Sequence, residues 1–365
     1  MERSRIAIIG CGDVAYRHYL PALADRADEV EICAFVDSRP GAAEQAVAFV
    51  AGWSPGASAH TDVAAMVGAG SVDAAINLTP APRHAEVSQA CAEAGLHVYS
   101  EKPLAGTLAE ADRLIATARE RDLLLLCAPG VAVTERFGWL ASVVASERLG
   151  RLTLAVAQHA DTGPATWREY TGDPTPFYAA GVGPLFDHGV YRLHGLTMLL
   201  GPVRRVQAMG TISSPTRLVR SGPLAGTTIP VTTPDHVLMN LEFERGALGQ
   251  LTTSFAAPAT LAPWMELQFE HGTISLGGES SDPDAPVRLY VDDDSPLGLE
   301  GWVENLQLPA DVSTVRAGVD HFVSCLRGEA APVLTAEHAR HVLDIILKAY
   351  ASIEDGHSHD TETTF

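Results

Sequence analysis

The chain has 365 residues, of which 46% are hydrophobic and 19% are charged, and its formal net charge is −20 at pH 7. This acidic balance argues against a nucleic-acid partner and against docking on an anionic membrane, because both need a basic surface. No apolar run approaches the roughly 20 residues of a membrane span, and the first expected strand begins near residue 5, too early for a secretion signal.

The five cysteines are scattered along the chain without a close pair, at positions 11, 33, 91, 127 and 325. An odd, scattered set fits neither a disulfide framework nor a zinc site. We therefore expect a cytoplasmic protein with reduced thiols and no bound metal.

Strands and helices alternate in the first part of the chain. Short apolar runs predict buried strands over 5–10, 30–36, 72–78, 97–100 and 123–127. The stretches between them predict helices over 14–26, 41–50, 83–94 and 108–121, the first of them interrupted at Pro21. Such alternation implies right-handed crossovers and a parallel sheet, so we assign residues 1–128 to a Rossmann-type α/β domain.

Extended runs dominate after residue 129. A helix over 136–146, a strand over 152–158, a polar aromatic segment and a helix over 185–200 come first. Further strands are expected over 203–211, 237–243, 247–255, 265–269, 273–276 and 287–291, with hairpin turns at 244–246 and 271–272. Helices are expected over 312–327 and 336–352. Residues 129–353 should thus form an α+β domain with a large, open, mostly antiparallel sheet, followed by a disordered polar tail over 354–365.

A glycine-rich turn follows the first expected strand. Residues 10–15 are Gly-Cys-Gly-Asp-Val-Ala and fit the dinucleotide-binding pattern G-x-G-x-x-G/A. Gly10 permits the tight turn, Gly12 lets a pyrophosphate approach the backbone, and Ala15 is small enough for close packing of helix on strand. Backbone N–H groups around Asp13 and Val14, at the start of the helix, would face the phosphates.

The residues after the second strand bear on the choice of cofactor. The carboxylate of Asp37 can accept hydrogen bonds from the adenosine ribose hydroxyls and would repel a 2′-phosphate, which favours NAD. Ser38 and Arg39 follow and could receive that phosphate, so NADP is the alternative. A glycine-rich turn that binds no nucleotide is the other interpretation of this segment.

Only two of the 25 basic residues are lysines, Lys102 and Lys348. A GC-rich codon supply explains the scarcity, but Lys102 also stands at the carboxyl end of a strand, where open parallel sheets bind ligands. Lysine can lose its proton when desolvated, whereas arginine stays charged. Lys102 is therefore a candidate for holding the reacting oxygen of a substrate, with an ordinary loop cation as the alternative. Lys348 is expected to be a surface or ion-paired residue.

A second set of polar residues lies in the helix expected over 185–200. Asp187, Tyr191 and His194 are spaced i, i+4 and i+7, which predicts a common helix face, and the Gly-Val-Gly-Pro turn at 181–184 leads into it. Such a face suggests a site, although a tyrosine and a histidine that satisfy core hydrogen bonds would give the same pattern. The preceding segment mixes polar groups with aromatic rings, a combination that suits contact with a sugar, although a mobile connecting loop is the alternative. Its candidates are His159, Asp161, Trp167, Arg168, Tyr170 and Phe177.

Together these motifs resemble the Gfo/Idh/MocA oxidoreductases, the family of glucose–fructose oxidoreductase and inositol dehydrogenase. The resemblance spans nearly the whole chain and rests on the Gly10 loop, the turn 77–80 with His84, Glu101-Lys102-Pro103 and the stretch 181–194. It implies a large open sheet that faces the nicotinamide, and a Lys102–Pro103 peptide bond that is cis. It adds further residues to those expected to bind the cofactor: Thr79, Pro80, His84, Glu101 and Lys102.

The resemblance also implies a chemistry. The family's acid/base group lies four residues after the aspartate, which is Tyr191 here, whereas the second aspartate of the inositol-type pattern is replaced by His194. We therefore expect hydride transfer between nicotinamide and a secondary alcohol or ketone of a sugar, sugar derivative or cyclitol other than inositol. Tyr191 would exchange the proton, with His194 or His188 as the alternative base, while Lys102 and Asp187 orient the substrate oxygens.

Two other functions fit the same residues. One is a redox-neutral epimerase, lyase or glycosidase that passes through a transient keto-sugar. The other is a non-catalytic dinucleotide sensor, against which the presence of both Lys102 and Asp187 argues. In each case we expect a small sugar-like partner, and a homodimer or homotetramer formed through the exposed face of the second sheet.

Overall fold

The structure is a computed structural model that describes residues 3–70, 72–168, 170–277, 285–303, 306, 308 and 312–365. The chain divides into two compact units. The first comprises Met1–Thr134 and Val312–Leu343, and the second comprises Glu135–Asp311 and Asp344–Phe365. Helix α9 (Ala336–Asp355) passes from the first unit to the second.

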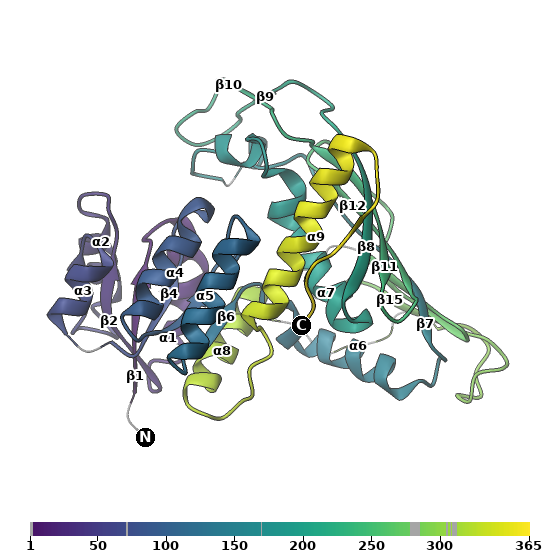
Figure 1. The fold of residues 1–365 in the computed structure, drawn as a ribbon, viewed down its shortest axis with the longest axis horizontal. Helices are drawn as coiled ribbons and strands as arrows, with labels where there is room; N and C mark the ends of the chain where they lie inside the picture. Colours follow the sequence, from purple (N-terminus) through teal and green to yellow (C-terminus); the bar gives the residue numbers. More distant parts are fainter. Residues whose placement is uncertain are drawn as a thin grey trace. The chain divides into compact units, whose positions relative to one another are not determined.

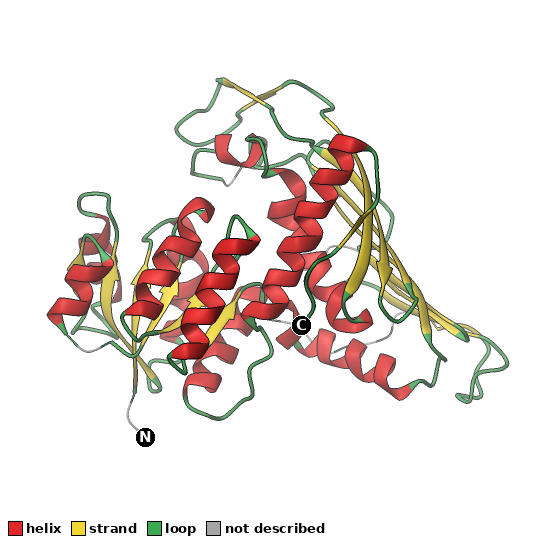
Figure 2. Ribbon diagram, in the orientation of Figure 1, coloured by secondary structure: helices red, strands yellow, loops and turns green. Residues whose placement is uncertain are grey.

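The first unit is built on a parallel sheet (Figures 1 and 2). Its described strands are β1 (Ser4–Ile9), β2 (Val30–Val36), β3 (Ser58–His60), β4 (Ala74–Asn77), β5 (His97–Ser100) and β6 (Leu125–Cys127). They lie in the order β3-β2-β1-β4-β5-β6, and every neighbouring pair is parallel. The strand order reverses between β1 and β4, so ligands of this fold are expected at the carboxyl ends of those two strands. The predicted Rossmann-type fold is confirmed.

Helices pack on this sheet through small and aliphatic side chains. The described helices are α1 (Leu20–Ala24), α2 (Ala42–Val50), α3 (Val63–Ala69), α4 (His84–Glu93), α5 (Leu108–Glu120) and α8 (Thr314–Leu326), with short turns η2 (Ala81–Arg83) and η3 (Gly130–Val133). Residues of α1, α2 and α8 join those of β1, β2 and β4 in one apolar cluster. The sequence patterns predicted four of these helices within a few residues but missed the short elements β3 and α3, since β3 is largely exposed and has no apolar alternation.

The helix predicted over 14–26 is interrupted, as Pro21 suggested. Residues Ala15–Tyr19 form a π-helical turn, η1, and α1 then begins with Pro21 in its first turn. Proline has no N–H to donate back along the helix, so it fits the first turn of α1. The wider turn before it is the kind of irregularity that often marks functional segments.

The expected boundary between the domains needs one correction. Residues 312–343 belong to the first unit, not to the second domain over 129–353. The reason is a close approach of helix α8 to the turn η3: a Cβ on Gly130 would lie 2.5 Å from the backbone nitrogen of Gly318. The rings of Tyr99 and Phe322 also stack at 5.4 Å, and Cys127 N–H donates to Leu334 O at 3.0 Å. These contacts join segments far apart in sequence.

The second unit is dominated by a nine-stranded sheet among its described residues, in the order β16-β15-β14-β13-β7-β12-β11-β8-β17. The strands are β7 (Leu152–Ala160), β8 (Val203–Thr211), β11 (His236–Phe243), β12 (Leu248–Ser254), β13 (Met265–Phe269), β14 (Gly272–Leu276), β15 (Val287–Val291), β16 (Gly301–Val303) and β17 (His359–Asp360). Only β7 and β12 pair in parallel among these strands, so the predicted mostly antiparallel sheet is confirmed.

The remaining described elements of the second unit are α6 (Glu135–Ser146), the turn η4 (Thr175–Tyr178), the π-turn η5 (Leu185–Gly189), α7 (Val190–Leu200) and a small hairpin of β9 (Thr216–Leu218) with β10 (Thr228–Pro230). Both predicted hairpin turns are present, because β11 pairs with β12 and β13 pairs with β14.

The prediction of a disordered tail over 354–365 is wrong. Helix α9 continues to Asp355, and β17 pairs with β8 at the sheet edge. The fully buried carboxylate of Asp344 accepts hydrogen bonds from Glu362 N and Thr363 Oγ1, and Lys348 forms an ion pair with Glu362. A polar composition suggested disorder, but a buried carboxylate needs partners and the tail supplies them.

Candidate functional site

The glycine loop joins the carboxyl ends of three strands. Gly10 has a φ of +96°, and a Cβ there would lie 2.6 Å from the carbonyl carbon of Leu78, so only glycine fits. Gly10 N–H donates to Val36 O at 2.8 Å, which ties the loop to β2. A Cβ on Gly12 would instead meet nothing within 4 Å. The open side of the loop is therefore at Gly12, next to the exposed residues Asp13 and Val14.

Asp37 is held in a network of hydrogen bonds at the end of β2. Its Oδ2 accepts from Cys11 N at 2.8 Å and from Arg39 Nη2 at 2.8 Å, and its Oδ1 accepts from Arg39 N at 2.8 Å and Nε at 3.0 Å. Burial alone would raise the pKa of Asp37, but the hydrogen bonds from Arg39 and Cys11 hold it below its usual value. The carboxylate is only 7% exposed, whereas Arg39 is 62% exposed and Ser38 lies on the surface.

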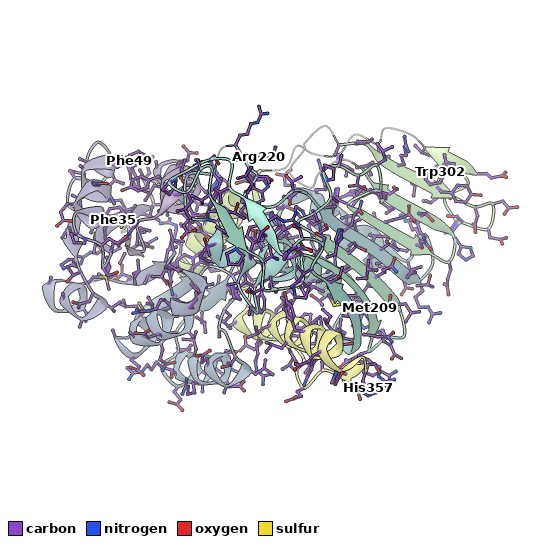
Figure 3. All side chains as sticks on the ribbon, turned by 90° about the horizontal axis from the view of Figure 1, so that it is seen from above. Phe35, Phe49, Met209, Arg220, Trp302 and His357 are labelled. Atoms are coloured by element: carbon purple, nitrogen blue, oxygen red, sulfur yellow. The ribbon has the colours of Figure 1, made fainter. Side chains whose placement is uncertain are left out.

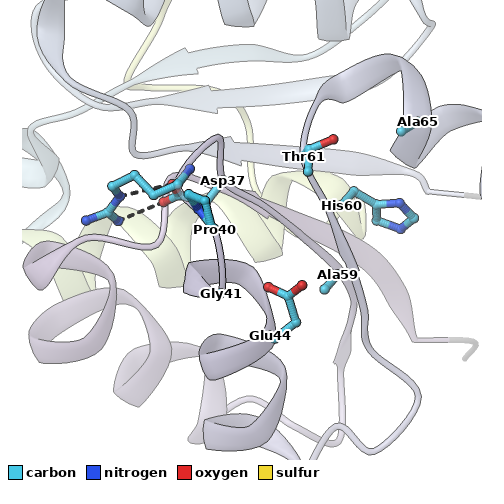
Figure 4. Close-up of a pocket in the computed structure, with 9 residues that line it drawn as sticks. Asp37, Pro40, Gly41, Glu44, Ala59, His60, Thr61 and Ala65 are labelled. Atoms are coloured by element: carbon cyan, nitrogen blue, oxygen red, sulfur yellow. Dashed lines mark hydrogen bonds and ion pairs between the residues drawn. The ribbon is translucent and has the colours of Figure 1, made fainter.

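A hollow opens beside Asp37 (Figure 4). It is lined by Asp37, Arg39, Pro40, Gly41, Glu44, Ala59, His60, Thr61 and Ala65. In the close-up, Glu44 extends from α2 toward this space, and His60 lies at the end of β3 with its ring directed away from Asp37. Sequence patterns did not indicate Glu44, His60 or Thr61. Strand β3 is too short to be predicted, and the helix pattern around Glu44 does not show that this residue lies near Asp37.

The turn after β4 is locked by Asn77 and His84. Thr79 donates to Asn77 Oδ1 through both its N–H (3.2 Å) and its hydroxyl (2.7 Å). His84 is 2% exposed, and its two ring nitrogens lie 2.7 Å from the carbonyl oxygens of Thr79 and Pro103. This ring joins the 79–80 turn to the loop that contains Lys102, and its ring nitrogens are both occupied by the protein itself.

Glu101 fixes the backbone at Lys102. Its Oε1 accepts from the hydroxyl of Tyr19 at 2.7 Å, and its Oε2 accepts from Lys102 N at 2.9 Å. The Lys102–Pro103 peptide bond is cis, as the resemblance implied. The structure thus brings the Gly10 loop, Asp37, the 79–80 turn and Lys102 to one edge of the sheet, at the strand ends where a dinucleotide is expected. Burial raises the pKa of Cys11 to about 12, so the thiol in this loop is neutral at pH 7.

The second unit carries the other candidates, and here the predicted helix face is altered. Asp187 lies in the π-turn η5, which runs directly into α7 at Val190, so the segment that carries Asp187, Tyr191 and His194 is not one regular α-helix. His194 is 4% exposed, which removes it from any accessible surface of the unit. Tyr191 is partly exposed and the carboxylate of Asp187 is 12% exposed.

His188, which the sequence offered only as an alternative base, lies in a cluster of rings. Its ring stacks on His159 at 3.7 Å with an interplanar angle of 4°, and its Nε2 lies 3.3 Å from Asp187 Oδ2. Trp167 meets the ring of His188 edge-on at 5.6 Å, and Tyr191 lies at 6.4 Å.

The expected sugar-contact segment joins this cluster in part. Trp167 Nε1 donates to Asp161 Oδ2 at 3.1 Å, and Tyr170 meets the edge of Trp167 at 6.2 Å. Arg168 is exposed. The sequence placed His159 and Asp161 in the same polar, aromatic segment as Trp167, but it did not place them beside His188. Only the tertiary fold brings these residues together, since 29 positions separate His159 from His188.

No helix in the described ranges is both long and apolar enough to cross a membrane. All five cysteines lie in described parts of the chain and are free thiols.

Comparison with known proteins identifies the family. The profile of the oxidoreductase family with an NAD-binding Rossmann fold matches residues 4–128, and the GFO/IDH/MocA C-terminal domain profile matches residues 137–275. A dTDP-3,4-didehydro-2,6-dideoxy-alpha-D-glucose 3-reductase from Actinomadura kijaniata is 30% identical over 281 residues, which is 72% of this chain and 79% of the relative. The D-glucoside 3-dehydrogenase of Escherichia coli K12 is 27% identical over 361 residues, 96% of each chain.

A solved structure supports the fold. The WlbA dehydrogenase from Chromobacterium violaceum, crystallised with NADH and UDP-GlcNAcA, superimposes with a TM-score of 0.77 at 20% identity, over all of this chain and 98% of the other. The two family profiles together cover well over half of the sequence, in the order in which the structure presents a Rossmann unit and an open-sheet unit. This chain belongs to the Gfo/Idh/MocA family of NAD-binding oxidoreductases.

Proposed function

We propose that the chain transfers a hydride between NAD and a secondary alcohol or ketone on a sugar ring. The observation that carries the proposal is the first unit's sheet edge, where the Gly10 loop, the Asp37 carboxylate and the Glu101-anchored Lys102 loop lie at neighbouring strand ends. Relatives named for dehydrogenation or reduction at carbon 3 of a sugar support the substrate class. Carbon 3 is therefore the first position to test.

The residues at the sheet edge have distinct roles in this proposal. The backbone around Gly12 receives the pyrophosphate, and Asp37 accepts hydrogen bonds from the adenosine ribose. His84, whose ring nitrogens both lie against backbone carbonyls, positions the 79–80 turn and the Lys102 loop and makes no direct contact with the cofactor. The hollow beside Asp37 takes the adenosine end, with His60 and Thr61 on its wall.

Bound NAD supplies the hydride acceptor or donor, and the chain handles the proton. Lys102 holds the reacting oxygen with a compact ammonium group. Tyr191 takes the proton when an alcohol is oxidised and returns it when a ketone is reduced, a contribution of about 10²- to 10⁴-fold in rate. Asp187 orients neighbouring hydroxyls. We exclude His194 from this set because it is 4% exposed.

Two further features of the protein belong to the proposal. Five free thiols suit a reducing cytoplasm. Exposed apolar side chains on paired strands of the large sheet, among them Met209 (Figure 3) and Leu238, suit a homo-oligomer formed through that sheet. Light scattering coupled to size-exclusion chromatography, with Met209→Lys as the disrupting variant, tests the assembly.

A substrate screen tests the proposed function. Glycosides, nucleotide sugars, cyclitols and keto-sugars are mixed with enzyme and NAD, NADP, NADH or NADPH, and the absorbance of the reduced nicotinamide is followed. We expect turnover with at least one sugar and its 3-keto form. Products are also identified by mass spectrometry, since conversion without any accumulation of NADH would replace net oxidation by redox-neutral chemistry.

Substitutions test the assigned roles. Lys102→Arg keeps the charge but loses the compact ammonium, and Tyr191→Phe loses only the hydroxyl. We expect kcat to fall at least about 100-fold in each variant, with NADH affinity retained. The exposed Arg168→Lys substitution is not expected to alter NADH affinity. Near-normal turnover in Lys102→Arg or Tyr191→Phe would refute the role of that residue.

A further inference from the structure

Two histidines and an aspartate meet at the carboxyl end of β7, a central strand of the large sheet. His159 lies near the end of β7, Asp161 follows the strand, and His188 lies in the π-turn η5. One ligand atom of each residue lies within 4.8 Å of those of the other two. We propose that His159, Asp161 and His188 bind one divalent first-row transition ion such as Zn²⁺.

The donor set indicates the class of ion. Two imidazoles and one carboxylate suit Zn²⁺, Mn²⁺ or Fe²⁺, whereas Mg²⁺ and Ca²⁺ prefer oxygen ligands throughout. Three protein ligands leave at least one coordination position open. If the proposed function holds, a hydroxyl or carboxylate oxygen of the sugar substrate binds the ion at that open position; the ion site itself does not depend on that function.

The carboxylate is already oriented for this role. Asp161 Oδ1 accepts from Gly163 N at 2.8 Å, and its Oδ2 accepts from Trp167 Nε1 at 3.1 Å while lying 3.3 Å from His159 Nε2. Hydrogen bonds of this kind commonly orient metal ligands. His159 Nε2 is buried and has no hydrogen-bond partner among the described residues, although Asp161 is near, and a buried nitrogen of this kind needs a ligand.

The surroundings strengthen the binding of a cation. A second carboxylate, Asp187, lies 3.3 Å from His188 Nε2. The rings of Trp167 and Phe255 meet His188 edge-on at 5.6 Å and 6.0 Å, so the cluster is walled by aromatic groups that lower the local dielectric constant.

One adjustment is needed for both histidines to bind the same ion. Their rings are parallel at 3.7 Å, so their in-plane lone pairs point side by side and do not converge. One imidazole must turn about the Cβ–Cγ bond, a torsion with a broad energy profile. His188 and His159 are 25% and 19% exposed, which leaves room on the solvent side for this rotation.

Direct binding measurements test the site. Tag-free protein is dialysed against a chelator and titrated with ZnCl₂ by calorimetry, and Co²⁺ absorption bands report the coordination. We expect one Zn²⁺ per chain and at least about tenfold weaker binding in His159→Gln. His271→Gln is the matched control, because His271 Nδ1 also lies 3.3 Å from a carboxylate, Asp292, but is not part of such a three-residue cluster in the described structure. Its Zn²⁺ affinity should equal that of the unsubstituted protein.

Two outcomes of the Zn²⁺ titrations overturn the proposed ion site. No saturable Zn²⁺ binding by the unsubstituted protein, or an equal affinity of His159→Gln, would exclude the site. Asp161→Asn replaces His159→Gln if thermal melting shows that the latter does not fold. A parallel NADH fluorescence titration separates this test from that of the function: NADH binding without Zn²⁺ binding overturns the ion site alone, and Zn²⁺ binding without NADH binding overturns the dehydrogenase assignment alone.

Discussion

Exchanging Asp37 for serine should change which cofactor the enzyme prefers. In the structure the carboxylate takes four hydrogen bonds, and three of them come from Arg39. Ribose hydroxyls therefore bind Asp37 in competition with a guanidinium that already occupies both oxygens. Removing the carboxylate abolishes the ribose acceptor and releases Arg39 for a 2′-phosphate.

The magnitude follows from these contacts. A hydrogen bond to a charged group contributes about 1.5–3 kcal/mol. The two adenosine ribose hydroxyls donate to Asp37 in the proposed complex, and in the variant water or the serine hydroxyl replaces part of this interaction. A net loss of one such bond raises the Kd of NADH roughly 10- to 150-fold. The gain for NADPH is smaller, about 0.2–1 kcal/mol, because Arg39 is exposed and screened. The ratio of the two dissociation constants should shift by at least about 15-fold toward NADPH, and by more because the repulsion of the 2′-phosphate by Asp37 is lost.

Fluorescence titrations of NADH and NADPH measure this ratio. Taking the ratio cancels a general disturbance of the loop, which Asp37 also supports through Cys11 N. The double variant Asp37→Ser/Arg39→Ala is the control: it should lose affinity for NADH equally and gain less for NADPH, because the repulsion by the carboxylate is removed but Arg39 is absent. The reasoning is refuted if the ratio in Asp37→Ser stays within about threefold of the original, because deviations of nearly that size occur even between independent sites. It is also refuted if the double variant gains as much affinity for NADPH as the single variant.

Three further predictions concern stability and substrate contact. Gly318→Ala places a Cβ 2.1 Å from the hydroxyl of the buried Tyr99, so it should lower the free energy of unfolding by about 1–3 kcal/mol. The control Gly138→Ala, on the exposed side of α6, places a Cβ with nothing within 4 Å and should raise that free energy by about 0.5–1 kcal/mol. Thermal or denaturant unfolding measures both, and equal effects would contradict the close docking of α8. The pKa of Asp37 is lowered in the fold, so its contribution to stability is present above the unfolded pKa of about 3.9 and is lost as the pH falls through the lower folded pKa. The difference in melting temperature between the original chain and Asp37→Asn should therefore shrink below about pH 4. A difference that stays constant with pH would contradict this prediction. Trp167→Ala should raise KM for the sugar more than it lowers NADH affinity, as the ring belongs to the second unit's cluster, and an effect on NADH alone would place Trp167 outside the substrate contact.

The expected disorder of the C-terminal tail shows where sequence patterns stop being informative. Residues 354–365 are polar, and nothing in their order indicates the buried Asp344 carboxylate that accepts from Glu362 and Thr363. The same holds for α8, whose amphipathic pattern predicted a helix but not the sheet it covers. Composition and hydrophobic periodicity indicate the secondary structure of a segment, whereas the element against which it packs depends on the whole fold.

The candidate site divides in the same way. Local chemistry determined the Gly10 turn, because a φ of +96° against the backbone of Leu78 excludes every side chain, and it determined the Asp37 and Lys102 positions at strand ends. Only the tertiary structure decided that His194 is buried, that Asp187 lies in a π-turn ahead of α7, and that His159 stacks on His188. The carboxyl ends of parallel strands lie along one side of the sheet whatever the loops contain, so a sequence motif is enough to place a residue there. A cluster drawn from β7, the following loop and η5 depends on pairing and packing across many residues, which no local pattern encodes.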